Sequence, residues 1–290
     1  MRTLIIGSTG QLGLACVEIF RSAGHDVIAA SHSEVEVADP QSVNRIFERD
    51  RPDALVNCAA YVRVNDAEDQ AEDAFRVNAI GARHVAQACT EFSTLCVYVS
   101  TDYVFDGALN RPYTEEDACR PLNVYGTSKL AGEYLVQQYS PRWLIARVAS
   151  LFGKAGSRGK GGNFVDTIVS HARAGRPIRV VNDVRMSPTY ALDAARALEH
   201  LVSREKTGVF HLANLGSCTW FEFARRILEV AGLDTIPEPI SSLEYPTKAQ
   251  RPRNSSLEST KLSPEVRVFL RPWEDALAAY LVEKDHEQRR

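Results

Sequence analysis

The sequence has no apolar run that approaches the roughly 20 residues needed to cross a membrane, and its N-terminus lacks a charged leader followed by a cleavage site. It also carries little net charge, −3 at pH 7, which gives no electrostatic reason for binding nucleic acid or an anionic membrane surface. We therefore expect a cytoplasmic protein with neither a membrane nor a nucleic-acid partner.

Cysteine is sparse as well, with six scattered residues that mostly sit in apolar segments. No C-x-x-C pair occurs, and no Cys/His spacing suits zinc, so we predict no metal site. Cysteines of this kind are typical of free thiols in a reducing compartment.

The chain does contain a regular alternation of apolar strands and amphipathic helices. Its 290 residues, 44% of them hydrophobic, are enough to bury a full core. Strands are predicted at residues 3–6, 26–30, 54–60, 95–99 and 143–148, and helices at 11–23, 40–50, about 71–92 and 124–139. Strands separated by helices of this length predict an α/β fold with a doubly wound parallel Rossmann sheet.

The composition changes after Phe152. Residues 153–162, GKAGSRGKGG, are predicted to form a mobile loop, and their spacing does not fit the phosphate loop of nucleotide hydrolases. Short helices, prolines and turns follow, with a final helix after Pro272. We expect residues 1–152 and 178–204 to form a dinucleotide-binding domain, and 153–177 and 205–290 a smaller substrate-binding region.

A glycine-rich turn, GSTGQLG at residues 7–13, lies between the first strand and the first helix. Glycines at this position let the backbone turn sharply and approach a pyrophosphate held at the helix N-terminus. A tight strand-to-helix turn without a ligand has the same glycines, but the place of this turn in the first strand–turn–helix unit favours dinucleotide binding.

The second predicted strand runs into Ser31, His32 and Ser33, with no carboxylate before Glu34. An acidic residue at this strand end would bind the ribose 2′-hydroxyl of NAD, whereas small hydroxyls and a histidine can bind a 2′-phosphate. The sequence thus favours NADP(H), with Ser31 and His32 as contacts, NAD as the alternative cofactor, and a solvated loop without a role in cofactor choice as the other interpretation.

Tyr125 and Lys129 share one face of the helix predicted to begin near Val124. A nearby ammonium group is expected to lower the tyrosine pKa, so that the tyrosine can give a proton to a carbonyl oxygen while hydride reaches the carbon. Thr101, at the end of the preceding strand, can hydrogen-bond the same oxygen. Together with the glycine turn, this constellation resembles the extended short-chain dehydrogenase/reductase family.

The motifs GSTGQLG, VNCAAY, STDYVFDG, PLNVYGTSKLAGE and RPRNSSL narrow the resemblance to the dTDP-4-dehydrorhamnose reductase family over nearly the whole chain. The resemblance implies an NADPH-dependent reduction of a nucleotide-linked 4-keto-6-deoxy sugar, with catalytic Thr101, Tyr125 and Lys129. The implied cofactor contacts are Gly7, Gly10, Gln11, Leu12, Asp39, Ala59, Ala60 and Asn78, besides Tyr125 and Lys129. The implied substrate contacts are Tyr103, Asn163 and Arg251; for Asn163 and Arg251 a loop cap or a salt bridge is an equal alternative.

The chain departs from the family pattern at two places. Members usually read R-T-S-W after the strand that ends near Val148, where this chain has Arg147-Val148-Ala149-Ser150, so an aromatic surface for the sugar is missing. The family's V-D-K-A-E is Val64-Asn65-Asp66-Ala67-Glu68 here.

Three other functions use similar machinery. Dehydratases carry a second carboxyl residue after the threonine–aspartate pair, where this chain has Tyr103, so elimination of water is disfavoured. A sugar-nucleotide epimerase stays open. The regulatory β subunit of methionine adenosyltransferase is also similar, which leaves a non-catalytic NADP-binding role as the non-enzyme alternative. We also consider a homodimer as the assembly.

Overall fold

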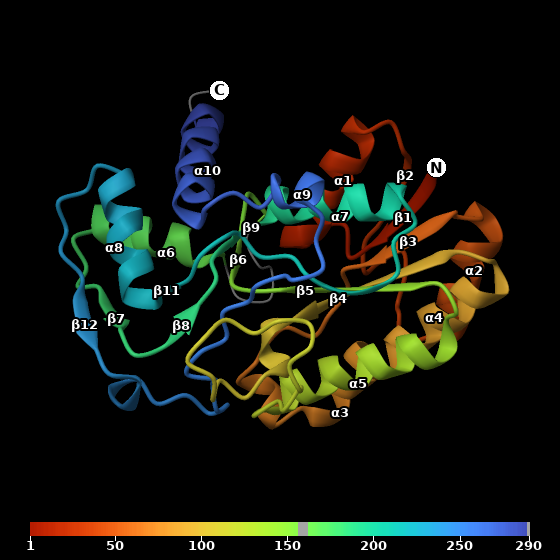
Figure 1. The fold of residues 1–290 in the computed structure, drawn as a ribbon, viewed down its shortest axis with the longest axis horizontal. Helices are drawn as coiled ribbons and strands as arrows, with labels where there is room; N and C mark the ends of the chain where they lie inside the picture. The colour runs from red at the N-terminus through yellow and green to blue at the C-terminus, as the bar shows by residue number, and fades with distance from the viewer. Residues whose placement is uncertain (156–161, 289–290) are drawn as a thin grey trace.

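The computed structural model describes residues 1–155 and 162–288, and its centre is a six-stranded parallel sheet (Figure 1). The strand order is β10-β5-β4-β3-β1-β2. The strands are β1 (Arg2–Ile6), β2 (Asp26–Ala30), β3 (Ala54–Asn57), β4 (Leu95–Thr101), β5 (Trp143–Val148) and β10 (Gly208–His211). The predicted doubly wound Rossmann sheet is therefore confirmed.

Helices cover both faces of this sheet (Figure 1). Helices α1 (Gln11–Ser22) and α7 (Ala191–Ser203) lie on one face; α2 (Pro40–Asp50), α4 (Ala82–Glu91) and α5 (Val124–Tyr139) lie on the other. Because both faces are covered, the central strands β3 and β4 are almost entirely buried, which explains their continuous apolar sequence.

The helix predicted over 71–92 is divided into three parts. Helix α3 (Ala71–Phe75) passes into a π-helical turn, η2 (Arg76–Gly81), before α4 begins. Within this turn the Asn78 carbonyl accepts a hydrogen bond from the Tyr98 hydroxyl at 2.7 Å. Helical periodicity cannot reveal such a turn, because π-turns arise as local bulges in an otherwise regular helix.

The smaller region lies beside the sheet and shares its core. It contains α6 (Phe164–Arg173), α8 (Trp220–Val230), α9 (Pro264–Arg267), α10 (Trp273–Gln288), η4 (Ser242–Glu244) and the strand pairs β6–β9 (Leu151–Phe152, Thr189–Tyr190), β7–β12 (Arg179–Val181, Glu238–Ile240) and β8–β11 (Arg185–Met186, Cys218–Thr219). Aromatic rings centred on Phe152 and Phe223 pack its helices together, and this cluster continues into the core beneath α1 and α7.

The strand pairing places the boundaries between the two parts of the chain at other residues than the composition suggests. The pair β7–β12 lies outside the large sheet, although β7 falls in the segment 178–204 expected to belong to the dinucleotide domain. Conversely, β10 completes the large sheet beside β5, although it falls in the segment 205–290 expected to belong to the smaller region. Such pairings are non-local, so composition does not contain them. We propose that the dinucleotide-binding part comprises residues 1–152 and the segment from α7 to β10.

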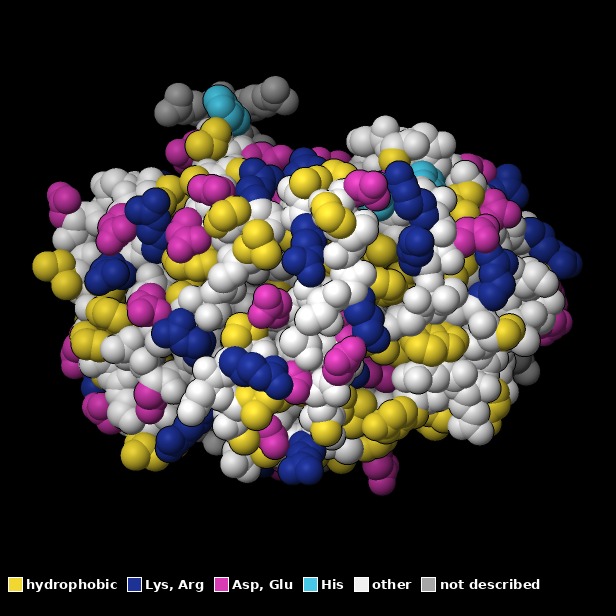
Figure 2. Space-filling model, in the orientation of Figure 1, with side chains coloured by type: hydrophobic (Ala, Val, Ile, Leu, Met, Phe, Trp, Pro, Cys, Tyr) yellow, Lys and Arg dark blue, Asp and Glu magenta, His cyan; other side chains and the backbone are white. Residues whose placement is uncertain are grey.

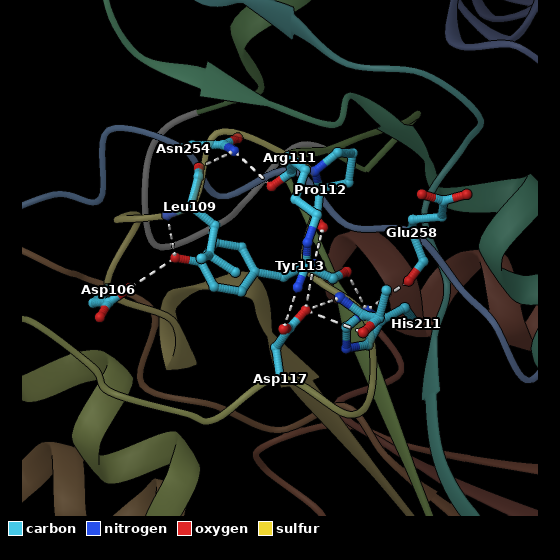
Figure 3. Close-up of polar contacts among 10 residues, drawn as sticks. Asp106, Leu109, Arg111, Pro112, Tyr113, Asp117, His211, Asn254 and Glu258 are labelled. Carbon is cyan, nitrogen blue, oxygen red and sulfur yellow. Dashed lines mark hydrogen bonds and ion pairs between the residues drawn. The ribbon is translucent and has the colours of Figure 1, made fainter.

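Figure 3 shows how the loop between η3 (Asp102–Val104) and α5 is tied to a distant segment. The Asn254 side chain donates to the carbonyls of Leu109 and Arg111, both at 2.9 Å, and the Tyr113 hydroxyl donates to Asp106 at 2.7 Å. The two bonds of Asn254 fix the segment that starts there against the dinucleotide-binding part, while the Tyr113 bond lies within the loop itself.

Acidic and basic side chains are interspersed over the face drawn in Figure 2. The six cysteines are free, as predicted. In the described ranges, 1–155 and 162–288, no helix combines the length and the apolar character needed to span a membrane. Most of the glycine-rich loop predicted at 153–162 lies outside the described residues.

Candidate active site

A cavity of about 620 Å³ opens at the carboxyl edge of the sheet. Its walls come from the turns after β1, β3, β4 and β5 and from the first turns of α5, α6 and α8. The sequence-predicted residues that line it are Gly7, Gly10, Gln11, Leu12, His32, Ala59, Ala60, Thr101, Tyr103, Tyr125, Lys129, Asn163 and Arg251. Ligands of open α/β sheets bind at this edge, so one cavity joins the candidate cofactor, catalytic and substrate residues.

The turn after β1 has the geometry that a pyrophosphate requires. Gly7 has a φ of +74°, and a Cβ there would lie 2.8 Å from the Ala59 nitrogen. A Cβ on Gly13 would lie 2.1 Å from the Gly7 carbonyl oxygen, so only glycine lets α1 start this close to the turn. Gly10 is the N-cap of α1 and no side chain caps this end, which suits an anion at the helix N-terminus.

Ser31 is hydrogen-bonded to the carboxylate of Glu34, three residues further along the chain. A tight turn brings Glu34 back to the end of β2, where its carboxylate accepts hydrogen bonds from the backbone nitrogen and the hydroxyl of Ser31, both at 2.8 Å. His32 is exposed and lines the cavity. The end of β2 therefore has a negative charge beside it, which belongs to Glu34 and not to a residue of the strand.

Asp39 and Asn78 do not line the cavity in the part of the chain that the structure describes, and neither does Ser31. Asp39 caps α2 by accepting from the Gln41 nitrogen at 2.9 Å, as the sequence predicts. The buried Asn78 side chain accepts from the Tyr61 nitrogen at 2.8 Å and donates to Ser128 at 2.9 Å. Asn78 thus shapes the turn after β3 that borders the cavity, and direct cofactor contacts of these three residues stay a prediction.

Helix α5 brings the catalytic candidates together. Its N-cap Asn123 accepts from the Gly126 nitrogen at 2.8 Å, which starts the helix at Val124 and places Tyr125 and Lys129 on one face. At the end of β4 the Thr101 hydroxyl lies near the Tyr125 hydroxyl, and it donates a hydrogen bond to the Asp102 carboxylate at 3.0 Å.

The pKa of Tyr125 is raised, contrary to the prediction that Lys129 lowers it. Burial is the main cause of the rise, the Thr101 hydroxyl opposes it, and the nearby Asp102 adds to it. The Lys129 ammonium instead donates to the Val99 carbonyl at 2.6 Å and lies 3.9 Å from the centroid of the Tyr98 ring. Tyr125 is therefore protonated at neutral pH, which is the state that a proton donor needs.

Tyr103 and Arg251 form the substrate side of the cavity. The Arg251 guanidinium donates to the Tyr103 hydroxyl at 3.3 Å, and the Tyr103 ring meets Tyr125 edge-on, with ring centroids 5.9 Å apart. Asn163 lines the cavity but also caps α6 by accepting from the Asp166 nitrogen at 2.9 Å. Its amide donates to the Gly153 carbonyl at 2.9 Å. The Asn163 side chain therefore has the contacts of a loop and helix cap, and a substrate contact stays a prediction.

Comparison with known proteins agrees with this geometry. A family model described as the RmlD substrate binding domain matches residues 1–285. The chain belongs to this family. It is 37% identical over 283 residues to the spore coat polysaccharide biosynthesis protein SpsK of Bacillus subtilis, with 98% of each chain covered. It is 37% identical to the dTDP-4-dehydrorhamnose reductase of Mycobacterium tuberculosis, covering 97% of this chain and 92% of that one. The resemblance predicted from the motifs is confirmed.

A solved structure of a family member is also similar. It is the dTDP-4-dehydrorhamnose reductase of Bacillus anthracis in complex with NADP, with a TM-score of 0.90 and 33% identity, covering 97% of this chain and 99% of that one.

Sequence reasoning missed the aromatic wall of the cavity. Phe164 and Trp220, at the first positions of α6 and α8, line it and pack edge to face with ring centroids 4.7 Å apart. Ser150, where many family members carry tryptophan, also lines the cavity, with a φ of +39°. Aromatic surface is therefore present in this member of the family, but it is provided by the smaller region. In the sequence, each of these aromatic residues directly follows the N-cap of its helix, and this pattern could have indicated them.

Lys129 gives a pH-dependent prediction. Burial lowers its pKa to about 7, while nearby Glu133 opposes the shift. Its ammonium is thus charged below about pH 7 and loses the proton as the pH rises. We expect NADPH affinity of the free protein to fall between about pH 6 and pH 8, because a neutral amine attracts the anionic cofactor less. Fluorescence titration across this range measures the NADPH dissociation constant. Lys129→Met is the control, because the ionisation of NADPH itself affects both proteins equally. An equal pH dependence in both proteins would contradict the prediction.

Proposed function

We propose that this protein is an NADPH-dependent reductase of a nucleotide-linked 4-keto-6-deoxy sugar. The observation that carries the proposal is the meeting of Thr101, Tyr125 and Lys129 in the same cavity as the glycine turn at Gly7. The names of the reductases in the family support the substrate class and the NADP complex of the Bacillus anthracis protein supports the cofactor.

The residues of the chain divide the reaction between them. When bound, NADPH supplies the hydride that reaches the carbonyl carbon of the sugar. Tyr125 donates its hydroxyl proton to the carbonyl oxygen, and Thr101 holds that oxygen by a hydrogen bond. Lys129 lines the same cavity and, when charged, would attract the anionic cofactor and help to hold it. Arg251 and Tyr103 hold the anionic nucleotide part of the substrate.

Turnover of sugar nucleotides tests the proposal. The protein is incubated with NADPH and with 4-keto-6-deoxy sugars linked to dTDP, UDP or GDP, and both cofactor and sugar are followed. A reductase oxidises one NADPH for each sugar reduced. An epimerase would change the sugar without net loss of cofactor. Absence of turnover with all three, combined with capture of a methionine adenosyltransferase, would support the regulatory-subunit alternative instead.

We further propose that the protein acts in the cytoplasm and forms a homodimer. Its six free thiols fit a reducing compartment. Light scattering of the purified protein tests the dimer.

Glu34→Gln is expected to strengthen NADPH binding relative to NADH. The Glu34 carboxylate bound to Ser31 lies at the strand end where the 2′-phosphate of NADPH is expected, so removing its charge removes a repulsion. An exposed charge contributes at most about 1 kcal/mol, so the ratio of the two dissociation constants should change up to about fivefold. Titration with both cofactors measures this ratio, and Glu48→Gln, an exposed carboxylate on α2, is the matched control. An unchanged ratio would place the phosphate elsewhere.

A further inference from the structure

Four consecutive residues of the smaller region, 248–251, each contact the dinucleotide-binding part. In chain order, the Lys248 ammonium pairs with Asp69, the Ala249 nitrogen donates to Asn65 at 3.4 Å, the Gln250 carbonyl accepts from Asn123 at 2.8 Å, and Arg251 donates to Tyr103 at 3.3 Å. We call residues 248–251 the bridging segment. It ends at the arginine that lines the cavity, so its position fixes where that guanidinium lies.

The contacts of the bridging segment differ in strength. The Lys248–Asp69 pair is exposed, with 51% and 65% of the two side chains accessible, and such pairs contribute little. The bond from Ala249 to Asn65 is long. Asn123 is only 5% exposed and its bond to the Gln250 carbonyl is short, so it is the firmest of these polar contacts, beside the burial of the Ala249 side chain.

Asn123 uses both ends of its amide. Its oxygen accepts from the Gly126 nitrogen and caps α5, two residues before Tyr125, while its nitrogen donates to the Gln250 carbonyl, one residue before Arg251. A single buried side chain therefore joins the helix that carries the proton donor to the segment that carries the substrate-side guanidinium.

The chain beyond the bridging segment is fixed independently. Asn254 is held by the carbonyls of Leu109 and Arg111, as Figure 3 shows. Loss of the Asn123 contact would thus free a short stretch around Gln250 and Arg251 without detaching the segment that follows.

We propose that Asn123 is a positioning residue that sets the place of Arg251 relative to Tyr125, and thereby the affinity for the nucleotide part of the substrate. This inference rests on the proposed reductase function. It predicts that breaking only the bond to Gln250 weakens substrate binding and leaves the chemical step and the cofactor site in place.

Asn123→Asp separates the two roles of the side chain. Aspartate is as good an N-cap as asparagine, so α5 stays capped, but the carboxylate cannot donate to the Gln250 carbonyl and repels it. We expect KM for the sugar nucleotide to rise about tenfold or more, with kcat within about threefold of wild type and the NADPH dissociation constant unchanged. Asn65→Asp makes the same chemical change in a residue that only accepts from the bridging segment, and should leave KM unchanged.

Trypsin gives a readout that needs no turnover. The bond after Lys248 lies in the bridging segment, and cleavage there requires local opening. Without substrate, Asn123→Asp should be cut at this bond faster than wild type and Asn65→Asp. If wild type reduces no sugar nucleotide, the proposed function fails while the cleavage rates still decide whether Asn123 holds the segment. Unchanged cleavage, or a fall in kcat at constant KM, would overturn the positioning role.

Discussion

Tyr125→Phe is expected to lower turnover of the sugar nucleotide by roughly 10²–10⁴-fold, the usual contribution of a positioned proton donor. The variant loses one oxygen, which lies near the Thr101 hydroxyl inside the cavity. Folding and NADPH binding should stay nearly intact, because neither the cap of α5 nor the glycine turn involves this oxygen.

Stopped-flow kinetics under single-turnover conditions and a separate NADPH titration measure the two effects. Lys129→Met serves as the comparison: it should reduce turnover and also weaken NADPH binding, since its ammonium acts on both. If Tyr125→Phe reduced the sugar at the wild-type rate, Tyr125 would not be the proton donor. The result would favour the alternative of a non-catalytic NADP-binding protein.

Arg147→Met is expected to destabilise the folded protein by about 3–5 kcal/mol, because it leaves a buried carboxylate with the Ser100 hydroxyl as a partner but without a compensating charge. Arg147 and Glu133 are 5% and 1% exposed and form two parallel hydrogen bonds, at 2.9 and 2.7 Å. The pair ties the end of β5 to α5, one helical turn beyond Lys129. The methionine side chain fills similar space but cannot compensate the Glu133 charge.

Urea unfolding measures the free energy of each variant. The double variant Arg147→Met/Glu133→Leu should recover much of the lost stability, since it removes both charges. Arg49→Met, which removes a solvent-exposed arginine paired with Asp50 on α2, should cause only a small loss. A similarly small loss for Arg147→Met would show that Glu133 takes up a proton in the folded state or that the Ser100 hydroxyl is a sufficient partner.

The sequence alone determined the features that depend on neighbouring residues. Helix α2 begins at Pro40 because Asp39 caps it and proline suits its first position, and both signals are local. The spacing of Tyr125 and Lys129 follows from helical geometry, and the glycine turn follows from its place between a strand and a helix. These patterns were sufficient to predict the Rossmann sheet, the family and a set of site residues, most of which line the cavity.

The tertiary structure decided what depends on residues far apart in the chain or on burial. No local pattern shows that Asn123 reaches Gln250, or that the aromatic wall comes from Phe164 and Trp220. The pKa of Tyr125 moved opposite to the expectation because burial of the hydroxyl dominates it, while the Lys129 ammonium is bound by the Val99 carbonyl. Helical spacing fixes which side chains share a face, whereas the solvent and the charges around them are fixed only when strands and loops pack.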